Sequence, residues 1–338
     1  MQDSIVFVTG GSGFIGSEII KTLCAKGFRI RALLRSTSSR ENLKNMNFET
    51  IDGGIDDASA LRKGVQGAHY VIHAAGVIFA KSREDFFKTN VGGTVLLAKI
   101  CGEVNPELKR FLFVSSLAAA GPAPGKNAIT ESDRENPISH YGESKLTAER
   151  EIAKILKGKT PLTIIRPPAV YGPRDHGMFE FFKIVSKGII PKFPSKNAEN
   201  EKYLSLIYVD DLVEGILRAT LIDSRHDLRN PKKYFLANLK VSTISEFLKE
   251  IKNAFGKKTL SVYFPRVAIK AVACLGSAAG YLTGKVYPMN LDKWREAQSD
   301  YWICSAEKAK KELGFESKMA LEKGLQITTK WYQDHGWI

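Results

Sequence analysis

Three glycines spaced three residues apart constrain the start of this chain more than any other feature of its sequence. They occur in VTGGSGFIG, between a strand-forming run (SIVFVT, 4–9) and a helical stretch (SEIIKTLCAKG, 17–27). Gly10 permits a tight turn, Gly13 lets the backbone approach a pyrophosphate, and Gly16 allows close packing of the helix. The free N–H groups and the positive dipole at the N-terminus of the helix attract phosphate.

A glycine pattern alone also arises in structural turns, so its place between a strand and a helix is what favours a dinucleotide site. Both the side chains and the backbone groups of this turn are expected to contact the cofactor. The predicted contacts in this turn are Gly10, Ser12, Gly13, Phe14, Ile15 and Gly16.

Strand-forming and helical stretches alternate through the first half of the chain. Further strands are expected at 28–34, 48–52, 69–75, 110–116 and 162–167, with a late one at 232–238. Helices are expected at 57–63, 85–103, 141–157 and 209–222. This βαβ rhythm predicts an α/β fold with a doubly wound parallel sheet of the Rossmann type.

The pattern changes near residue 171 and divides the chain in two. Residues 171–203 show no clear strand, and the sequence from 241 onward is helical apart from a short strand at 260–265. We therefore expect a cofactor-binding domain at 1–170, to which 204–240 returns. A smaller, mostly helical substrate-binding region is expected within 171–338, mainly at 171–203 and 241–338.

Composition narrows the function classes. The net charge of +14 would suit an anionic partner, but the lysines alternate with acids and no nucleic-acid-binding motif is present. The histidines show no ligand spacing, so no metal site is expected. Four widely separated cysteines, without a CxxC pair, favour reduced thiols in a cytoplasm. The N-terminus does not have the form of a signal peptide.

One segment is apolar enough to raise the question of contact with a membrane. AVACLGSAAGYL (271–282) is too short to span a membrane, and the chain has no run of about 18 apolar residues. We interpret the segment as a buried helix. A weak interfacial contact with a membrane remains the alternative.

The residue after the second strand bears on the choice of cofactor. Sites for NAD usually place an acid there, whereas an arginine suits the 2′-phosphate of NADP. The strand ends in RALLRSTSSR, which offers Arg35 and no acid; Ser36, Ser38 and Arg40 could also contact phosphate. NADP is therefore favoured, with NAD as the alternative.

Tyr141 and Lys145 are spaced i and i+4 in HYGESK, so a helix would place them on one face. The pKa of a free phenol is about 10, and a neighbouring ammonium lowers it toward the range in which the group can act as an acid–base at neutral pH. Such a pair could move a proton to or from a substrate oxygen while a nicotinamide moves hydride.

The chain resembles the extended short-chain dehydrogenase/reductases, the NAD-dependent epimerase/dehydratase family. Within them it is most similar to the dihydroflavonol reductase and 3β-hydroxysteroid dehydrogenase branch. The resemblance covers almost the whole length, including the C-terminal segment AEKAKKELGF…LEKGLQITTKWYQDHGWI. The shared motifs stand in family order: TGGSGFIG (9–16), HAAG (73–76), NVGGT (90–94), VSS (114–116), YGESK (141–145), RPPAVYGPRD (166–175) and YVDDL (208–212).

The resemblance implies catalytic roles. Tyr141 would be the acid–base and Lys145 its partner. The family serine lies about 25 positions before the tyrosine (141 − 116 = 25) and five before a glycine, which selects Ser116 ahead of Gly121. Strand alternation then turns Ser115 to the opposite face, where it would pack or bond to backbone.

Further roles come from the same resemblance. Three small residues of HAAG would leave room for the cofactor, Asn90 would order the helix beside the site, and two residues after the sixth strand would line the nicotinamide. Asp210 and Asp211 are interpreted as scaffold acids. Gly54 departs from the family, which usually has an adenine-binding Asp there; Asp52 or the backbone of Ile55 would substitute. The added cofactor residues are Ala74, Ala75, Gly76, Asn90, Pro167 and Val170.

Three hypotheses about function follow. The first is an NADP-dependent oxidoreductase acting on a non-nucleotide small molecule. The second is a nucleoside-diphosphate-sugar epimerase with retained NAD, and the third is a non-catalytic NADP-binding regulator. The intact serine, tyrosine and lysine count against the regulator, and Leu117 and Ala118, where dehydratases carry acids, count against dehydration.

The choice between reductase and epimerase rests on the second domain. Nucleotide-sugar enzymes often carry an arginine just before the VDD segment, whereas this chain has Leu204, Ser205 and Leu206 there, with Lys202 farther off. The reductase is favoured. By resemblance, we expect a homodimer formed through the helices at 85–103 and 141–157.

Overall fold

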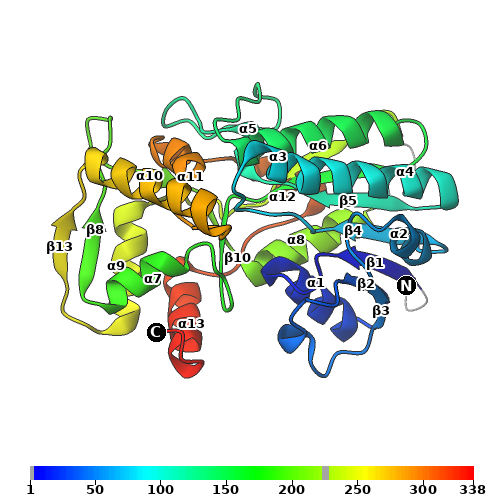
Figure 1. Ribbon diagram of the computed structural model, residues 1–338, viewed down its shortest axis with the longest axis horizontal. Helices are drawn as coiled ribbons and strands as arrows, with labels where there is room; N and C mark the ends of the chain where they lie inside the picture. The colour runs from blue at the N-terminus through cyan, green and yellow to red at the C-terminus, as the bar shows by residue number, and fades with distance from the viewer. Residues whose placement is uncertain (1–3, 223–227) are drawn as a thin grey trace. The chain divides into compact units, whose positions relative to one another are not determined.

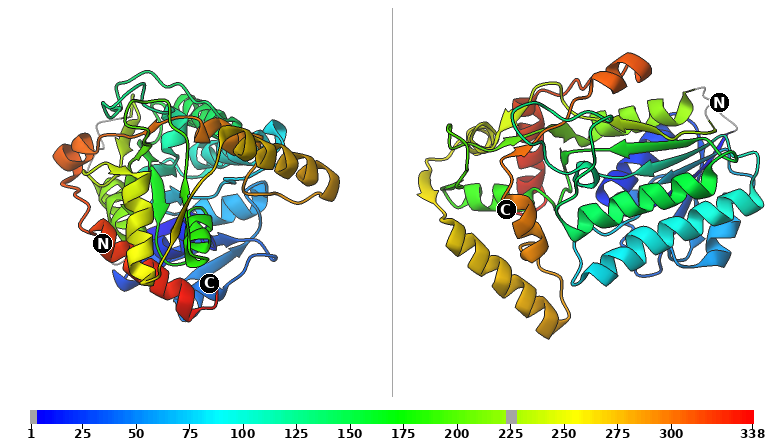
Figure 2. Two further views of the ribbon diagram at one scale, coloured as in Figure 1. Left: turned by 90° about the vertical axis from the view of Figure 1, so that its left-hand side faces the viewer. Right: turned by 90° about the horizontal axis from the view of Figure 1, so that it is seen from above.

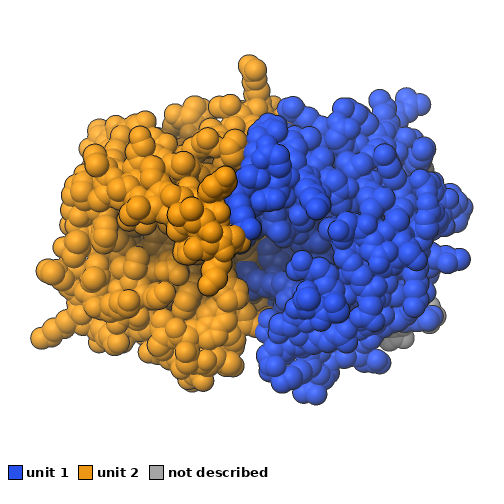
Figure 3. Space-filling view, viewed as in Figure 1, with its two compact units in different colours: residues 1–119, 141–166, 213–234 blue, residues 120–140, 167–212, 235–338 orange. Residues whose placement is uncertain are grey.

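The computed structural model describes residues 4–222 and 228–338. These form two compact units, coloured separately in Figure 3. Unit 1 comprises residues 1–119, 141–166 and 213–234, and unit 2 comprises residues 120–140, 167–212 and 235–338. The predicted assignment of cofactor binding to one part and substrate binding to another stays a prediction.

A seven-stranded sheet forms the centre of unit 1, in the order β11-β6-β5-β4-β1-β2-β3 (Figure 1). Neighbouring strands from β6 to β3 pair in parallel, for example with Val6 opposite Tyr70 and Phe111 opposite Leu162. The chain order reverses beside β1, as in a doubly wound fold, so the predicted fold class is confirmed. The strands are β1 (Ile5–Thr9), β2 (Arg29–Leu34), β3 (Glu49–Asp52), β4 (Tyr70–His73), β5 (Arg110–Val114), β6 (Leu162–Arg166) and β11 (Lys232–Phe235).

Helices cover both faces of this sheet, as Figures 1 and 2 show for α4 and α6 on one face and α1 and α8 on the other. The helices and helical turns are α1 (Phe14–Ala25), η1 (Glu41–Leu43), α2 (Ala58–Val65), α3 (Arg83–Phe86), η2 (Phe87–Gly93), α4 (Thr94–Val104), α5 (Leu117–Ala120), α6 (His140–Leu156) and α8 (Val209–Leu221).

The core of unit 1 lies between the sheet and α2, α4 and α6. Phe7 and Phe111 from the strands pack with Leu97 and Ile152 from the helices, and all four are fully buried. Burying a phenylalanine of this kind contributes up to about 3 kcal/mol. The continuous apolar strands therefore form because helices remove both faces of the sheet from water.

Unit 2 combines short strands with helices. Its core contains Tyr171, Phe182, Phe247, Leu325 and Tyr332. The strands are β7 (Ala169–Tyr171), β8 (Ile189–Lys192), β9 (Tyr203–Leu204), β10 (Leu206–Tyr208), β12 (Ser242–Thr243), β13 (Leu260–Tyr263) and β14 (Tyr301–Trp302). The helices are α7 (Phe179–Ser186), α9 (Ile244–Phe255), α10 (Arg266–Thr283), α11 (Leu291–Ala297), α12 (Glu307–Leu313) and α13 (Leu321–Asp334).

Two expectations about unit 2 are wrong. Residues 171–203 do contain a strand, β8, which the sequence does not indicate because Pro191 interrupts its apolar run. A two-stranded pairing with β13 tolerates the missing N–H. The segment 271–282 is not buried. It lies in α10, of which only Ala273 and Gly280 are buried, because a single narrow face of the helix packs against the protein.

The scaffold interpretation of Asp211 agrees with the structure, and that of Asp210 stays a prediction. Asp210 and Asp211 both lie in the first turn of α8. The Asp211 carboxylate accepts hydrogen bonds from the Ser317 hydroxyl at 2.6 Å and from the backbone N–H groups of Lys318 and Met319 at 3.0 and 2.8 Å. It fixes the segment that leads into α13.

Candidate active site

The glycine turn after β1 is closely packed. Gly10 has a φ of +76°, and a Cβ there would lie 2.6 Å from the backbone N of Ala75. A Cβ on Gly16 would lie 2.0 Å from the carbonyl oxygen of Gly10. Each glycine is therefore required by the close approach of the backbone on either side of the turn.

The N-terminus of α1 fits the phosphates of a dinucleotide. Its N-cap residue is Gly13, and no side chain caps the helix, which leaves N–H groups of the first turn directed outward. A Cβ on Gly13 would meet one heavy atom within 4 Å, the Gly10 carbonyl oxygen at 3.3 Å, so the turn is closely packed there on one side and open on the other. Ser12, Phe14 and Ile15 are half-buried around it.

Arg35 follows β2 directly and is exposed. Its guanidinium makes no ion pair or hydrogen bond with any residue in the described part of the chain, whereas Arg40 is paired with Asp52 at 3.0 Å. Asp52, the expected substitute for the missing adenine-binding acid, is thus engaged by Arg40. The exposed Asp52 carboxylate and the backbone of Ile55 both stay predictions for that role; the Ile55 side chain packs on Gly93.

Tyr141 and Lys145 lie one turn apart on α6, and both are buried. The Lys145 ammonium donates to the carbonyl oxygen of Val114, at the end of β5, at 3.0 Å. A Cβ on Gly76 would lie 3.1 Å from Lys145 Nζ, so the lysine reaches the segment that follows β4. Burial lowers the pKa of Lys145 to about 8, and the carboxylate of Glu149 opposes that shift.

The two serines after β5 have different surroundings. Ser116 is half-buried, and its hydroxyl accepts the N–H of Ala118 at 3.1 Å, which leaves its own proton free to be donated elsewhere. Ser115 is buried, and its hydroxyl donates to Glu149 at 2.5 Å. The expected hydrogen bond from the Ser115 side chain to backbone is not found, because this hydroxyl bonds to the Glu149 carboxylate. The predicted opposite orientation of the two serines stays a prediction.

Asn90 joins two parts of the site. It lies in the π-helical segment η2, and its side-chain oxygen accepts the N–H of Val77 at 2.8 Å. Its amide donates to the carbonyl of Val77 and to the Ser144 hydroxyl, both at 3.0 Å. The extra residue of a π turn is a common way to aim such a side chain. Asn90 therefore fixes the chain after Gly76 against the first turn of α6.

A buried ion pair lies one turn beyond Lys145. Glu149 accepts from Arg166 Nε at 3.0 Å and Nη2 at 2.6 Å, and both side chains are 1% exposed. Lys233 approaches the same carboxylate at 4.0 Å. Together with Ser115, these contacts bind α6 to the ends of β5 and β6.

His73 is a second buried group. Thr94 donates to the carbonyl of Asn90 at 2.6 Å and so accepts from His73 Nε2 at 2.8 Å; His73 Nδ1 then accepts from Thr9 at 2.6 Å. Desolvation, with a smaller contribution from Lys145, lowers the pKa of His73 to about 3. The neutral ring connects β1, β4 and α4 directly behind the glycine turn.

Neither His73 nor Glu149 and Arg166 were among the predicted site residues. Glu149 could have been found by its spacing, because Tyr141, Lys145 and Glu149 repeat every four residues on one face of α6. Arg166 ends β6, a strand whose other residues are apolar apart from Thr163. His73 belongs to the HAAG motif, but the motif does not indicate that this side chain bonds to Thr9 and Thr94.

Pro167 and Val170 belong to unit 2. Pro167 follows β6 directly, and Val170 lies in β7 opposite Ile207 of β10. Ala74, Ala75 and Gly76 follow β4 in unit 1, where the backbone of the first two meets Gly10. The contact of Pro167 and Val170 with a nicotinamide stays a prediction.

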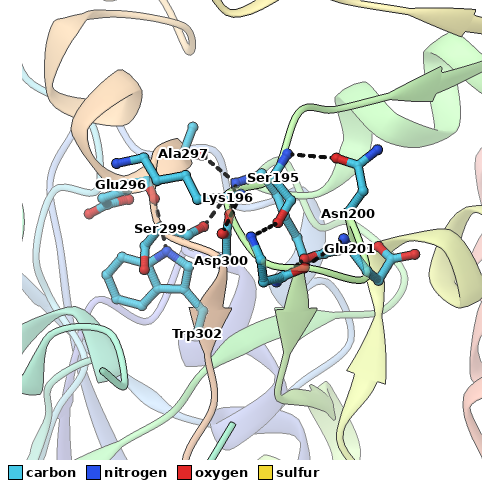
Figure 4. Close-up of polar contacts among 11 residues, drawn as sticks. Ser195, Lys196, Asn200, Glu201, Glu296, Ala297, Ser299, Asp300 and Trp302 are labelled. Atoms are coloured by element: carbon cyan, nitrogen blue, oxygen red, sulfur yellow. Dashed lines mark hydrogen bonds and ion pairs between the residues drawn. The ribbon is translucent and has the colours of Figure 1, made fainter. Parts of the chain in front are cut away.

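Lys202, also in unit 2, has three acceptors. Its ammonium donates to the carbonyls of Ala297 and Ser299 and to Asp300, each at 3.0 Å. Figure 4 shows the surrounding contacts, in which Asp300 also accepts the N–H of Lys196. Lys202 thus joins the end of α11 to the start of β9.

Within the described ranges 4–222 and 228–338, no cluster of three or more His, Cys, Asp or Glu side chains could hold a metal ion. The four cysteines are free thiols. No helix among the described residues is long and apolar enough to cross a bilayer.

The buried ion pair yields a prediction about stability. Glu149→Gln leaves the Arg166 guanidinium buried without its counter-ion and should lower the free energy of unfolding by about 3–5 kcal/mol. Replacing both residues, Glu149→Gln with Arg166→Met, should recover most of that loss. The matched control is Glu151→Gln on the same helix, which breaks an exposed pair with Lys154 and should cost less than about 1 kcal/mol. Urea unfolding measures all three; a double variant no better than the single one would contradict the ion-pair account.

His73 yields a prediction about pH. Its folded pKa of about 3 lies below the unfolded value of about 6.5, so between these values the unfolded chain binds a proton that the folded chain does not. The contribution of His73 to the free energy of unfolding is therefore fully present above about pH 6.5. It decreases as the pH falls, and at pH 4 this group alone has lowered the free energy of unfolding by about 3 kcal/mol. His73→Asn should flatten the dependence between pH 7 and 4, measured by urea unfolding, whereas His335→Asn, at an exposed position, should leave the wild-type slope. Equal slopes in all three proteins would refute the assignment.

Comparison with known proteins finds similarity along nearly the whole chain. Over 99% of its length, the chain is 26% identical to ceramide reductase of Caulobacter vibrioides, of which the match covers 96%. Over 98% of its length, its fold matches that of UDP-glucose 4-epimerase of Thermotoga maritima, with a TM-score of 0.77, 23% identity and 99% of that chain covered. Over 97% of the chain, it is 25% identical to 3β-hydroxysteroid dehydrogenase/Δ5→4-isomerase of Mycobacterium tuberculosis (90% of that protein). Residues 6–233 match the model of the NAD dependent epimerase/dehydratase family. The chain belongs to this family of NAD(P)-dependent enzymes.

Proposed function

We propose that this enzyme is an NADP-dependent oxidoreductase that interconverts a carbonyl and a secondary alcohol on a small molecule. The observation that carries the proposal is the buried Lys145 ammonium, which is tied to the end of β5 and lies one helical turn from Tyr141. A charge held in an apolar setting acts strongly on a neighbouring phenol. Ser116 at the same strand end supports the proposal.

A bound nicotinamide cofactor would supply or accept the hydride. The Tyr141 hydroxyl would give its proton to the substrate oxygen as the alcohol forms, and take it back in the reverse direction. Lys145 would stabilise the resulting phenolate, since at neutral pH a lysine with a pKa of about 8 is still mostly protonated. The Ser116 hydroxyl accepts the N–H of Ala118, so its own proton could be donated to the same substrate oxygen.

The glycine turn and Arg35 support the proposed cofactor. Gly10, Gly13 and Gly16 bring backbone N–H groups to the pyrophosphate, while the exposed guanidinium of Arg35 would pair with a 2′-phosphate. Ser12, Phe14 and Ile15 would contribute contacts in the same turn. Ala74, Ala75, Gly76 and Asn90 would border the ribose, and Pro167 and Val170 the nicotinamide.

The substrate class is argued from unit 2. Lys202, the cation that precedes the VDD segment most closely in sequence, already has three acceptors at 3.0 Å. Leu204 and Leu206 beside it are buried and apolar. The relatives named for a ceramide and for a steroid fit an apolar substrate better than a sugar nucleotide.

The free thiols support a reducing compartment such as the cytoplasm. The homodimer expected from family resemblance would use the faces of α4 and α6. Both remain part of the proposal.

Tyr141→Phe tests the acid–base assignment. Loss of the hydroxyl should lower turnover by about 10²–10⁴-fold while the affinity for cofactor stays nearly unchanged. NADPH oxidation would be followed with a panel of apolar ketones, steroids and long-chain amides bearing a carbonyl. Ser116→Ala should lower turnover in the same direction, and Ser115→Ala serves as the control, since it should reduce stability through Glu149 more than turnover. Full activity in Tyr141→Phe would end the assignment.

Arg35→Ala tests the choice of cofactor. Wild-type protein should bind NADPH more tightly than NADH, and the variant should lose about 1.5–3 kcal/mol of NADPH affinity, about tenfold or more, with little change for NADH. Fluorescence titration of the apo protein measures both. Arg62→Ala, which breaks an exposed pair with Glu103, is the control and should change neither affinity.

The nucleotide released when purified protein is denatured separates the two reaction classes. An empty site or exchangeable NADP agrees with the proposed oxidoreductase. Tightly retained NAD would contradict it and indicate an epimerase.

A further inference from the structure

Helix α10 turns an apolar stripe toward solvent. Val267, Ala271, Leu275, Ala278 and Leu282 follow one another at spacings of three or four residues and therefore share one face of the helix. All five are exposed, and Val267, Leu275 and Leu282 are 81%, 69% and 82% exposed. This is the reverse of the usual arrangement, in which the apolar face of a helix is buried.

The opposite face of α10 is already occupied by its own neighbours. Gly276 packs so closely on the backbone of Met289 that a Cβ would lie 2.0 Å from the carbonyl oxygen. The Ser277 hydroxyl accepts the N–H of Leu291, at the start of α11, at 2.9 Å. The helix is thus held from its inner side, beside α11 (Figure 1), and the outer stripe contributes nothing to that packing.

The stripe belongs to a stretch of chain in which exposed apolar side chains are concentrated. Of the eleven large hydrophobic side chains that are exposed among the described residues, nine lie between residues 260 and 291. We call these nine the α10 patch: Leu260, Tyr263, Val267, Val272, Leu275, Tyr281, Leu282, Val286 and Leu291. Patches of this kind on a soluble unit mark an interaction surface.

The charged residues within the segment that carries the α10 patch have one sign, and acids occur next at Glu250 and Asp292. Residues 251–291 contain no Asp or Glu, although acids make up 36 of the 338 residues. Six cations occur in the same segment, of which Lys257, Lys258, Lys270 and Lys285 are exposed. The remaining two are Lys252 and Arg266. An apolar stripe whose own segment carries cations and no acids complements a surface that is apolar beneath and anionic at its edge.

We propose that α10 and its flanking residues dock on the surface of an anionic lipid bilayer. The helix would lie in the interface, with its stripe toward the acyl chains and Lys270 and Lys285 among the headgroups. With 18 residues it is about 27 Å long and fits such a position lengthwise. A second copy of the chain is the poorer occupant, because a symmetric contact through the patch would bring cations together without any acid in the segment. This inference does not depend on the proposed reaction.

Cys274 provides a native probe on α10. It is exposed, whereas Cys101 and Cys304 are buried and Cys24 can be replaced by serine. A polarity-sensitive maleimide dye on Cys274 should shift to the blue when vesicles of phosphatidylcholine and phosphatidylglycerol are added. Vesicles of phosphatidylcholine alone should bind at least about tenfold more weakly, and salt should weaken binding to the mixed vesicles.

Two double variants separate the apolar contribution to vesicle binding from the ionic contribution. Leu275→Glu with Leu282→Glu should reduce binding to the mixed vesicles by at least about tenfold. Lys270→Gln with Lys285→Gln should reduce it by about 25-fold, since each cation near an anionic surface contributes about fivefold. The matched control is Leu239→Glu, an exposed leucine outside the α10 patch, which should bind as the wild type does. Co-sedimentation gives the affinities, and circular dichroism checks that each variant is folded.

Three outcomes would overturn the proposal. The dye could remain unshifted on mixed vesicles, or both kinds of vesicle could bind equally well. Alternatively, light scattering could show a dimer that Leu275→Glu with Leu282→Glu separates, without any binding to vesicles. That last result would make a second copy of the chain the occupant of the patch.

Discussion

The Glu149–Arg166 ion pair is the interaction on which the geometry of the candidate site depends. It ties the middle of α6 to the end of β6, and Ser115 adds the end of β5 to the same carboxylate. Tyr141 and Lys145 stand on this helix, so their position relative to the strand ends follows from a contact one or two turns away. A buried charge pair is costly to desolvate, but its bidentate geometry fixes one register of the helix.

Much of unit 1 could be predicted because local rules and the tertiary fold agree there. The glycine turn, the order of strands and helices, and the pairing of Tyr141 with Lys145 on one helical face all follow from spacing alone. The partners of buried polar groups could not be predicted in the same way. Thr9, His73 and Thr94 come from three elements and meet only after the sheet has formed.

Unit 2 shows where sequence patterns mislead. Pro191 hides a strand that a two-stranded sheet accepts, and the small residues of 271–282 resemble a core helix. In α10 those small residues do allow close packing, but on one side only, at Gly276 and Gly280. Hydrophobicity indicates that a segment avoids water in some context. It does not identify whether the protein or another surface provides that context.

The buried cation at Lys145 connects stability with chemistry. Burial lowers the pKa of Lys145 to about 8, which shows that the folded chain holds this ammonium at a cost while it remains charged. Glu149 reduces that cost from one turn away, yet it is itself neutralised by Arg166 and approached by Lys233. The carboxylate therefore supports the lysine without pairing with it directly. Lys145 keeps its ammonium directed to the strand end beside Tyr141, where a phenolate would gain most from it.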